Sequence, residues 1–108
     1  MLEHRQFYIN GAWVDPVVAN DFDVVNPSTE ENCAVISLGG QADTDAAVAA
    51  AKAAFETWSQ TSKEERIALL EKLLEIYNAR QEEMAQAMSI EMGAPINLSR
   101  AQQTGAGS

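Results

Sequence analysis

The feature that most constrains this chain is the abrupt change of residue type at Gly39-Gly40. Before this pair, short β-branched and aromatic runs alternate with Asn, Pro and Gly, whereas from Ala42 onward Ala, Glu, Leu and Gln predominate. The first pattern is typical of short strands joined by turns, and the second of long helices. The sequence predicts one domain at most, of the α/β class (α+β within this segment), with a β unit over residues 1–40 and a helical layer over residues 41–108.

The β unit is defined by its turn residues. Asn10-Gly11 between two apolar runs is the strongest short hairpin signal, and Asn26-Pro27 and Gly39-Gly40 each end a further run. These signals predict a small antiparallel unit. Its strands are expected at Phe7–Ile9, Ala12–Val14, Phe22–Val25 and Cys33–Leu38.

The first predicted helix begins at Asp43 or Thr44, either of which is a suitable N-cap. It carries an apolar stripe at helical spacing, and its other faces are mostly alanine. Small side chains on several faces permit close approach on more than one side, so we expect this helix to be sandwiched between other elements. The stripe consists of Val48, Ala51, Phe55 and Trp58.

Ser62-Lys63-Glu64-Glu65 is a capping box, in which Ser62 and Glu65 satisfy each other's backbone amides at the start of a second helix. A weak break is predicted near Asn78–Gln81, followed by a third helix that runs to Met92. Gly93 and Pro95 end that helix, since glycine adopts the left-handed C-cap and proline cannot continue the helix. Residues 96–103 are predicted to begin a fourth helix.

Glu91 presents the one local conflict in the sequence. It shares a helical stripe with Met84, Ala87 and Met88, so a carboxylate lies on an otherwise apolar face. It also lies in the last helical turn, where the macrodipole is negative and a carboxylate is unfavourable without a cation. A hard cation with oxygen ligands is one solution. A surface-directed side chain, or a pair with an arginine elsewhere, is the other.

Composition excludes several classes of partner. The formal net charge is -9, from 7 basic and 16 acidic residues, which argues against nucleic acid and anionic membrane surfaces. No apolar run approaches the roughly 18 residues of a membrane span, and no signal peptide is recognised at the N-terminus. The single cysteine, Cys33, indicates a reducing compartment, and the expected location is the cytoplasm.

The residues that could carry chemistry do not form a complete active site. Cys33 and His4 are the only thiol and imidazole, and their settings suggest a small core residue and a surface residue. One cysteine and one histidine have no zinc-ligand spacing. The acidic pairs Glu64/Glu65, Glu82/Glu83 and Asp43/Asp45 are interpreted as solvated helix starts, and Trp13, Trp58, Phe7 and Phe55 as core or interface anchors. No catalytic and no cofactor-binding residue is assigned.

An ordered set of motifs resembles the N-terminal segment of the aldehyde dehydrogenase superfamily. No piece is highly specific, but their order and spacing over about ninety residues resemble that family. Glu91-Met92-Gly93-Ala94-Pro95 departs from it slightly, since many members have an aspartate, one residue and Gly-Lys-Pro there. The other pieces are Phe7 to Val14, Val24-Val25-Asn26-Pro27-Ser28-Thr29, Asp43 to Trp58 and Ser62 to Leu74.

The resemblance implies the N-terminal part of an enzyme that uses NAD or NADP to oxidise an aldehyde to a carboxylic acid. In the family, the nucleophilic cysteine, the activating glutamate, the oxyanion asparagine and the cofactor-binding motifs lie downstream. The chain is therefore expected to be an inactive fragment of a parent that binds a small-molecule aldehyde and forms a homo-oligomer. The alternative is a free-standing structural or protein-interaction module that retains only this part of the fold.

The resemblance also implies a monovalent cation, Na⁺ or K⁺. Many members hold one through main-chain oxygens just before the asparagine-proline turn and through the aspartate before Gly-Lys-Pro. The matching positions are Val24, Val25 and Glu91. Glutamate is one methylene longer than aspartate, which alters the reach of the carboxylate toward the ion.

Overall fold

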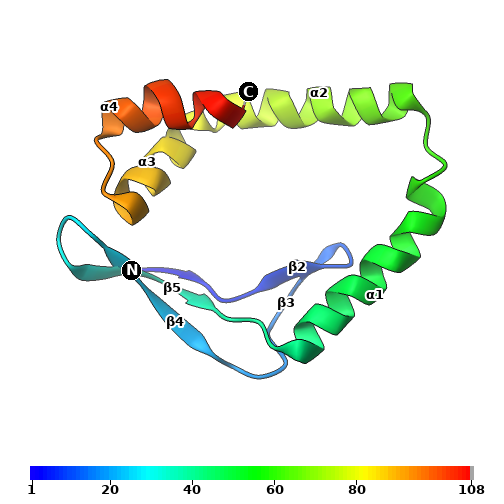
Figure 1. Cartoon of the computed structure of the whole chain (residues 1–108), viewed down its shortest axis with the longest axis horizontal. Helices are drawn as coiled ribbons and strands as arrows, with labels where there is room; N and C mark the ends of the chain where they lie inside the picture. The colour runs from blue at the N-terminus through cyan, green and yellow to red at the C-terminus, as the bar shows by residue number, and fades with distance from the viewer. Residues whose placement is uncertain (108) are drawn as a thin grey trace. The chain divides into compact units, whose positions relative to one another are not determined.

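The computed structural model describes residues 1–107 and has a mixed α/β fold (Figure 1). The strands are β1 (Leu2–His4), β2 (Phe7–Ile9), β3 (Ala12–Val14), β4 (Asp21–Asn26) and β5 (Glu31–Ser37). The helices are α1 (Gln41–Trp58), α2 (Lys63–Ala79), α3 (Gln81–Met92) and the short α4 (Ile96–Leu98). A π-helical turn, Ser99–Gln103, and a 3-10 turn, Gly105–Gly107, follow α4. The predicted order of strands first and helices second is confirmed.

The chain forms two compact units. The first contains residues 1–24 and 32–61, so α1 groups with the strands. The second contains residues 25–31 and the chain from Ser62 onward, so the tip of the β4–β5 hairpin groups with the later helices. This grouping differs from the sequence division at residue 40, because α1 contacts β2 (Figure 1).

The β2–β3 hairpin forms as predicted. Tyr8 lies opposite Trp13, and their rings meet edge to face with centroids 5.3 Å apart. Asn10 and Gly11 have φ values of 54° and 77°, and positive φ at both central residues is what a type I′ turn requires.

The second sheet has the order β1-β5-β4. Its β1 strand was not predicted, and it pairs in parallel with β5, with Leu2 opposite Ala34 and His4 opposite Ile36. The prediction of a purely antiparallel unit is therefore wrong. The reason is that β1 has three exposed residues and no apolar alternation, so its pairing depends on the buried central strand β5.

The N-terminus of α1 differs from the prediction. Gly40, rather than Asp43 or Thr44, is the N-cap residue, and the helix begins at Gln41. The Asp43 carboxylate accepts the backbone N–H of Gly40 at 2.8 Å, so the acid satisfies an amide from inside the first turn.

The second unit begins with the predicted capping box. Ser62 Oγ accepts the N–H of Glu65 at 3.1 Å, and the Glu65 carboxylate accepts the N–H of Ser62 at 2.7 Å. The predicted break is at Arg80, between α2 and α3. Tyr77 Oη donates to the carbonyl of Thr104 at 2.8 Å, which attaches the C-terminal turns to α2.

The core of the second unit is small and partly polar. Ala85, Ser99 and Thr104 are almost completely buried. Ser99 Oγ lies 3.2 Å from Ser89 Oγ and donates to Gln103 Oε1 at 3.0 Å, so the buried hydroxyl is satisfied. Small side chains at these positions permit α3 and the π-helical turn to approach closely.

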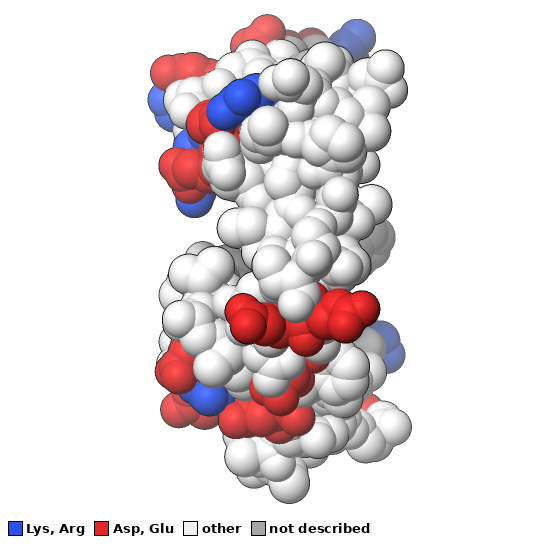
Figure 2. Space-filling model, turned by 90° about the vertical axis from the view of Figure 1, so that its left-hand side faces the viewer, with Lys and Arg blue, Asp and Glu red and all other residues white. Residues whose placement is uncertain are grey.

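Large apolar side chains remain exposed. The face shown in Figure 2 has acidic clusters, few basic side chains and a broad uncharged area. Six apolar residues of α2 are between 41% and 64% exposed, and no residue of α2 is buried. They are Ile67, Leu69, Leu70, Leu73, Leu74 and Ile76. Among residues 1–107, no helix has both the length and the apolar character to cross a membrane.

The aromatic residues expected as anchors are not in the core of the described chain. Trp13 is 66% exposed and Phe55 67%, while Phe7 is half-buried. Trp58 is 48% exposed, so the predicted stripe of α1 is uncovered as well. A role for these side chains at an interface stays a prediction.

Candidate functional site

The end of α3 contains Glu91, the residue for which the sequence predicts a role in binding a cation. Gly93 adopts the left-handed conformation, with φ 70° and ψ 12°, and its N–H donates to the carbonyl of Ser89 at 3.0 Å. Pro95 follows two residues later and precedes α4. The predicted glycine C-cap and proline stop are confirmed.

Gly93 also packs against the Asn26-Pro27 turn. A Cβ at Gly93 would lie 2.9 Å from Pro27 Cγ and 3.3 Å from Ser28 Oγ. Because only glycine leaves this space open, the C-terminus of α3 can come directly onto the turn. Glu91 lies two residues before Gly93, and Val25 lies two residues before Pro27. The contact of Gly93 with Pro27 therefore joins the two segments that contain Glu91 and Val25 within the second unit.

The backbone around the turn is well bonded. The Asn26 side-chain oxygen accepts the N–H of Ser28 at 2.9 Å, and the Asn26 backbone carbonyl accepts the N–H of Glu30 at 2.8 Å. Upstream, the Val24 carbonyl accepts the thiol of Cys33 at 3.3 Å. Val25 is 48% exposed.

The Glu91 carboxylate is exposed and forms no hydrogen bond or ion pair with another residue of the 1–107 range. The last turn of α3 contains no basic residue to offset it. The apolar stripe that Glu91 shares with Met84 is not the face that the helix buries. That face is centred on Ala85, which is 0% exposed, and α3 packs against the π-helical turn.

Cys33 and His4 are the other residues considered for a chemical role. Cys33 is half-buried and its thiol donates to a backbone carbonyl, in keeping with a packing role. The His4 imidazole is exposed on β1 and forms no hydrogen bond or ion pair with a described residue. Neither residue is paired with a base or nucleophile, as covalent catalysis requires.

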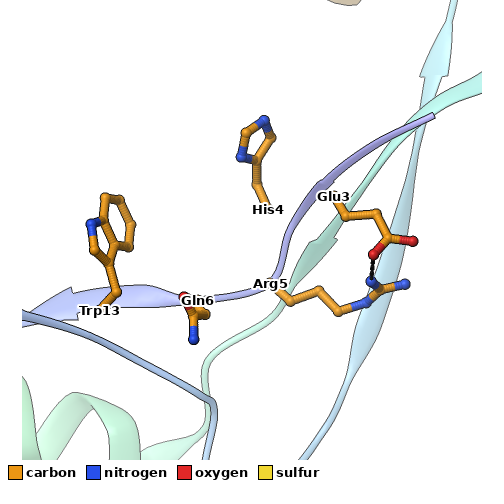
Figure 3. Close-up of a pocket in the computed structure, with 5 residues that line it drawn as sticks. All are labelled: Glu3, His4, Arg5, Gln6 and Trp13. Carbon is orange, nitrogen blue, oxygen red and sulfur yellow. Dashed lines mark hydrogen bonds and ion pairs between the residues drawn. The ribbon is translucent and has the colours of Figure 1, made fainter.

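His4 lines a cavity of about 280 Å³ together with Glu3, Arg5, Gln6 and Trp13 (Figure 3). The side chains do not converge on a common point, since the Glu3–Arg5 pair lies apart from the His4 and Trp13 rings. Arg5 Nε also donates to Asp21 at 2.9 Å, and this bond together with Glu3 raises the pKa of Arg5. The arginine is therefore engaged in joining strands.

Asp43 has a role that the sequence interpretation missed. It was expected to be a solvated helix-start residue, but it is only 7% exposed. Its carboxylate accepts the N–H of Gly40 and, at 2.9 Å, that of Val17, and these bonds hold the pKa of Asp43 below its usual value. An acidic residue three positions after Gly40 is a sequence signal for the bond to the Gly40 amide. The bond to Val17 joins residues 26 positions apart, and no local sequence pattern indicates it.

Glu82 was also expected to be a solvated helix-start residue, but it forms an ion pair. Its carboxylate accepts two hydrogen bonds from Arg100, at 2.8 and 2.6 Å, and the pair lowers the pKa of Glu82 to about 2. Both side chains are about half exposed, so the contribution to stability is modest.

Within residues 1–107, no group of three or more His, Cys, Asp or Glu side chains is arranged to hold a metal. What remains is the Glu91 carboxylate, the main chain of Val24 and Val25, and the contact of Gly93 with Pro27.

Comparison with known proteins identifies relatives for almost the whole chain. A family model described as the aldehyde dehydrogenase family matches residues 13–107. A 3-succinoylsemialdehyde-pyridine dehydrogenase of a Pseudomonas species is 45% identical over 96 residues, which is 89% of this chain and 20% of that protein. A putative aldehyde dehydrogenase of Staphylococcus aureus is 40% identical over 99 residues, with 92% and 21% covered.

Solved structures contain the same fold. An aldehyde dehydrogenase of Bartonella henselae superposes with a TM-score of 0.98 at 54% identity, over 99% of this chain and 22% of that chain. Aldehyde dehydrogenase C of Pseudomonas syringae, a mutant solved with NAD⁺ and octanal, gives 0.92 at 48% identity, over 94% and 21%. The chain thus spans about a fifth of the length of the proteins it matches.

Proposed function

Since the chain belongs to the aldehyde dehydrogenase family, we propose that it is the N-terminal portion of an enzyme that oxidises an aldehyde to a carboxylic acid with NAD. Its own part in that enzyme is structural. The exposed apolar faces of α1 and α2 are the surfaces on which the remainder of the parent packs.

The observation that carries this proposal is the near-complete superposition on a chain about five times as long. Because the fold is kept at 54% identity within a larger enzyme, we expect the same faces of the segment to be used for packing. The exposure of α2 supports the same conclusion, because an amphipathic helix is stabilised mainly by burying its apolar face.

The test is an activity assay with two samples. The full-length parent should reduce NAD in the presence of aldehydes, and the purified 108-residue chain should not. Turnover by the 108-residue chain would contradict the structural role, and an inactive parent over a panel of short and medium-chain aldehydes would contradict the activity. The alternative of a free-standing interaction module predicts an inactive chain that is produced alone in cells, which immunoblotting detects.

The cofactor assignment concerns the parent and not these residues. Gly39-Gly40 leads into α1, but the Asp43 carboxylate already takes the amide of Gly40, and a negative charge there opposes a pyrophosphate. The start of α1 therefore does not fit the pyrophosphate of NAD. Neighbours solved with NAD⁺ support NAD over NADP for the parent, and assays with each cofactor in turn distinguish the two.

A second part of the proposal is a monovalent cation, Na⁺ or K⁺, held by main-chain oxygens of Val24 and Val25 and by the Glu91 carboxylate. Glu91 has no side-chain partner among residues 1–107, and the last turn of α3 contains no basic residue; both observations support the site. The ion would neutralise the carboxylate and steady the turn, with no part in the oxidation.

Thermal melts of the full-length parent test the cation without relying on activity. We expect the midpoint to change when Na⁺ is exchanged for K⁺ or for a bulky organic cation, and this difference to disappear in Glu91→Gln. The matched control is Glu71→Gln, because Glu71 is also an exposed helical glutamate without a partner among residues 1–107. A midpoint that ignores both the ion and Glu91→Gln would contradict the site.

Two further assignments belong to the parent. The single free thiol, Cys33, supports a reducing compartment, and the proposed location is the cytoplasm. A homo-oligomer is proposed for the parent, and light scattering on the full-length protein measures its mass. Cell fractionation checks the location.

A further inference from the structure

The tip of the β2–β3 hairpin exposes a reactive pair of residues. Asn10 and Gly11 are both exposed, and a Cβ at Gly11 would meet no atom within 4 Å. The Asn10 carboxamide and the Gly11 N–H form no hydrogen bond with another residue of the described chain. The amide carbon of Asn10 and the nitrogen of Gly11 are therefore both unprotected.

We propose that Asn10 is a site of spontaneous modification, at which its carboxamide becomes a carboxylate. The Gly11 nitrogen, after losing its proton to water or hydroxide, attacks Cγ of Asn10 and forms a five-membered succinimide. The carboxamide nitrogen leaves as ammonia. Water then opens the ring at either carbonyl, giving aspartate or isoaspartate, so the net change is water consumed and ammonia released, without oxidation or reduction.

The other asparagines are protected, each for a structural reason. Asn26 precedes Pro27, whose nitrogen has no hydrogen, so this ring cannot form. The Asn32 amide donates to Asp23 at 2.7 Å. The nitrogen after Asn97 donates to a carbonyl at 2.9 Å. Asn20 and Asn78 precede residues of β4 and α2, whose backbones are held by those elements.

Ring closure requires the Asn10–Gly11 backbone to leave its left-handed turn, and the hairpin permits this. β2 and β3 form a sheet of only two short strands. Such hairpins are marginally stable alone, and exposed loop tips open locally at low cost in free energy. Glycine at the attacking position adds no side chain to hinder the approach.

The modification would change the electrostatics of the first unit. Asn10 lines a cavity of about 540 Å³ between the hairpin and α1, and Asp15 and Asp43 line the same cavity. Conversion adds a third carboxylate to this wall, where like charges repel. Isoaspartate also lengthens the backbone by one methylene, which disturbs the register of Ile9 with Ala12.

Peptide mapping by mass spectrometry tests the proposal. The purified 108-residue chain is incubated in mildly alkaline buffer, with circular dichroism confirming that its secondary structure persists. The expected result is the mass increase of amide-to-acid conversion on the peptide containing Asn10, before any other asparagine, with aspartate and isoaspartate both present. An unchanged Asn10, or earlier conversion of Asn20, Asn32, Asn78 or Asn97, would overturn it.

Variants separate the chemistry from its consequence. Asn10→Gly keeps a residue suited to positive φ and removes the carboxamide, so its hairpin peptide should show no mass increase. In the full-length parent, Asn10→Asp reproduces the added charge and should lower the thermal midpoint, more at low salt than at high salt. Asp15→Asn in the same chain should recover part of that loss. A midpoint of Asn10→Asp equal to the original at low salt would refute the electrostatic consequence.

Discussion

Gly93→Ala is the most direct test of the contact between α3 and the Asn26-Pro27 turn. Two costs are expected. A non-glycine residue in the left-handed region costs about 1–2 kcal/mol. The new methyl would lie 2.9 Å from Pro27 Cγ, and overpacking of this kind costs about 1–3 kcal/mol. The sum is about 2–5 kcal/mol, because the rigid proline ring cannot rotate away.

Amide hydrogen exchange in the full-length parent measures this locally. In Gly93→Ala, amides at the end of α3 and at Ser28 and Glu30 should exchange at least about 30-fold faster, the equivalent of 2 kcal/mol. Two control substitutions separate the costs. Gly11→Ala has the positive φ, 77°, with no atom near the methyl, and Gly105→Ala has neither problem.

The order of the three substitutions is the prediction. Gly93→Ala should raise local exchange most, Gly11→Ala by the backbone cost alone, and Gly105→Ala little or not at all. If Gly93→Ala raised exchange no more than Gly11→Ala, the close contact with Pro27 would be refuted, and with it the argument that this contact relates Glu91 to Val25.

Three further predictions concern the second unit and the exposed faces. Tyr77→Phe removes the donor to the buried Thr104 carbonyl and should cost about 1–3 kcal/mol, measured as faster exchange of residues 99–107 in the parent; unchanged exchange would contradict a stabilising bond. The pKa of Glu82 falls from 4.5 to about 2 on folding, so its contribution to stability is present above pH 4.5 and is lost as pH falls toward 2. Glu82→Gln should therefore reduce the loss of stability between pH 4.5 and pH 2 in an acid denaturation experiment. An unchanged pH dependence of stability over this range would count against the ion pair. The isolated 108-residue chain should self-associate or bind a hydrophobic dye, and Leu70→Lys and Leu73→Lys together should reduce both effects. A sharp two-state melt as a monomer, without dye binding, would show that the exposed apolar faces of α1 and α2 do not drive association.

Local chemistry accounts for the parts of the fold that sequence reasoning predicted correctly. Asn10-Gly11 specifies a turn with two positive φ values, Ser62 and Glu65 satisfy each other's amides, and Gly93 with Pro95 ends α3. Each signal lies within a few residues of the structure it predicts. The order of strands, helices and breaks follows from such signals, because they act before any distant part of the chain is in place.

Pairings between distant residues could not be predicted in this way. The parallel strand β1, the bond from Val17 to Asp43 and the burial of Ala85 and Ser99 depend on tertiary packing. Glu91 illustrates the division. Its place in the last helical turn, where a carboxylate lacks a cation, is determined by spacing and by the stop at Gly93. The tertiary structure decides which face α3 buries and places Gly93 against Pro27. The physical reason is close packing, which favours the small residues Ala85 and Gly93 at the contact over the larger apolar side chains of the Met84 stripe.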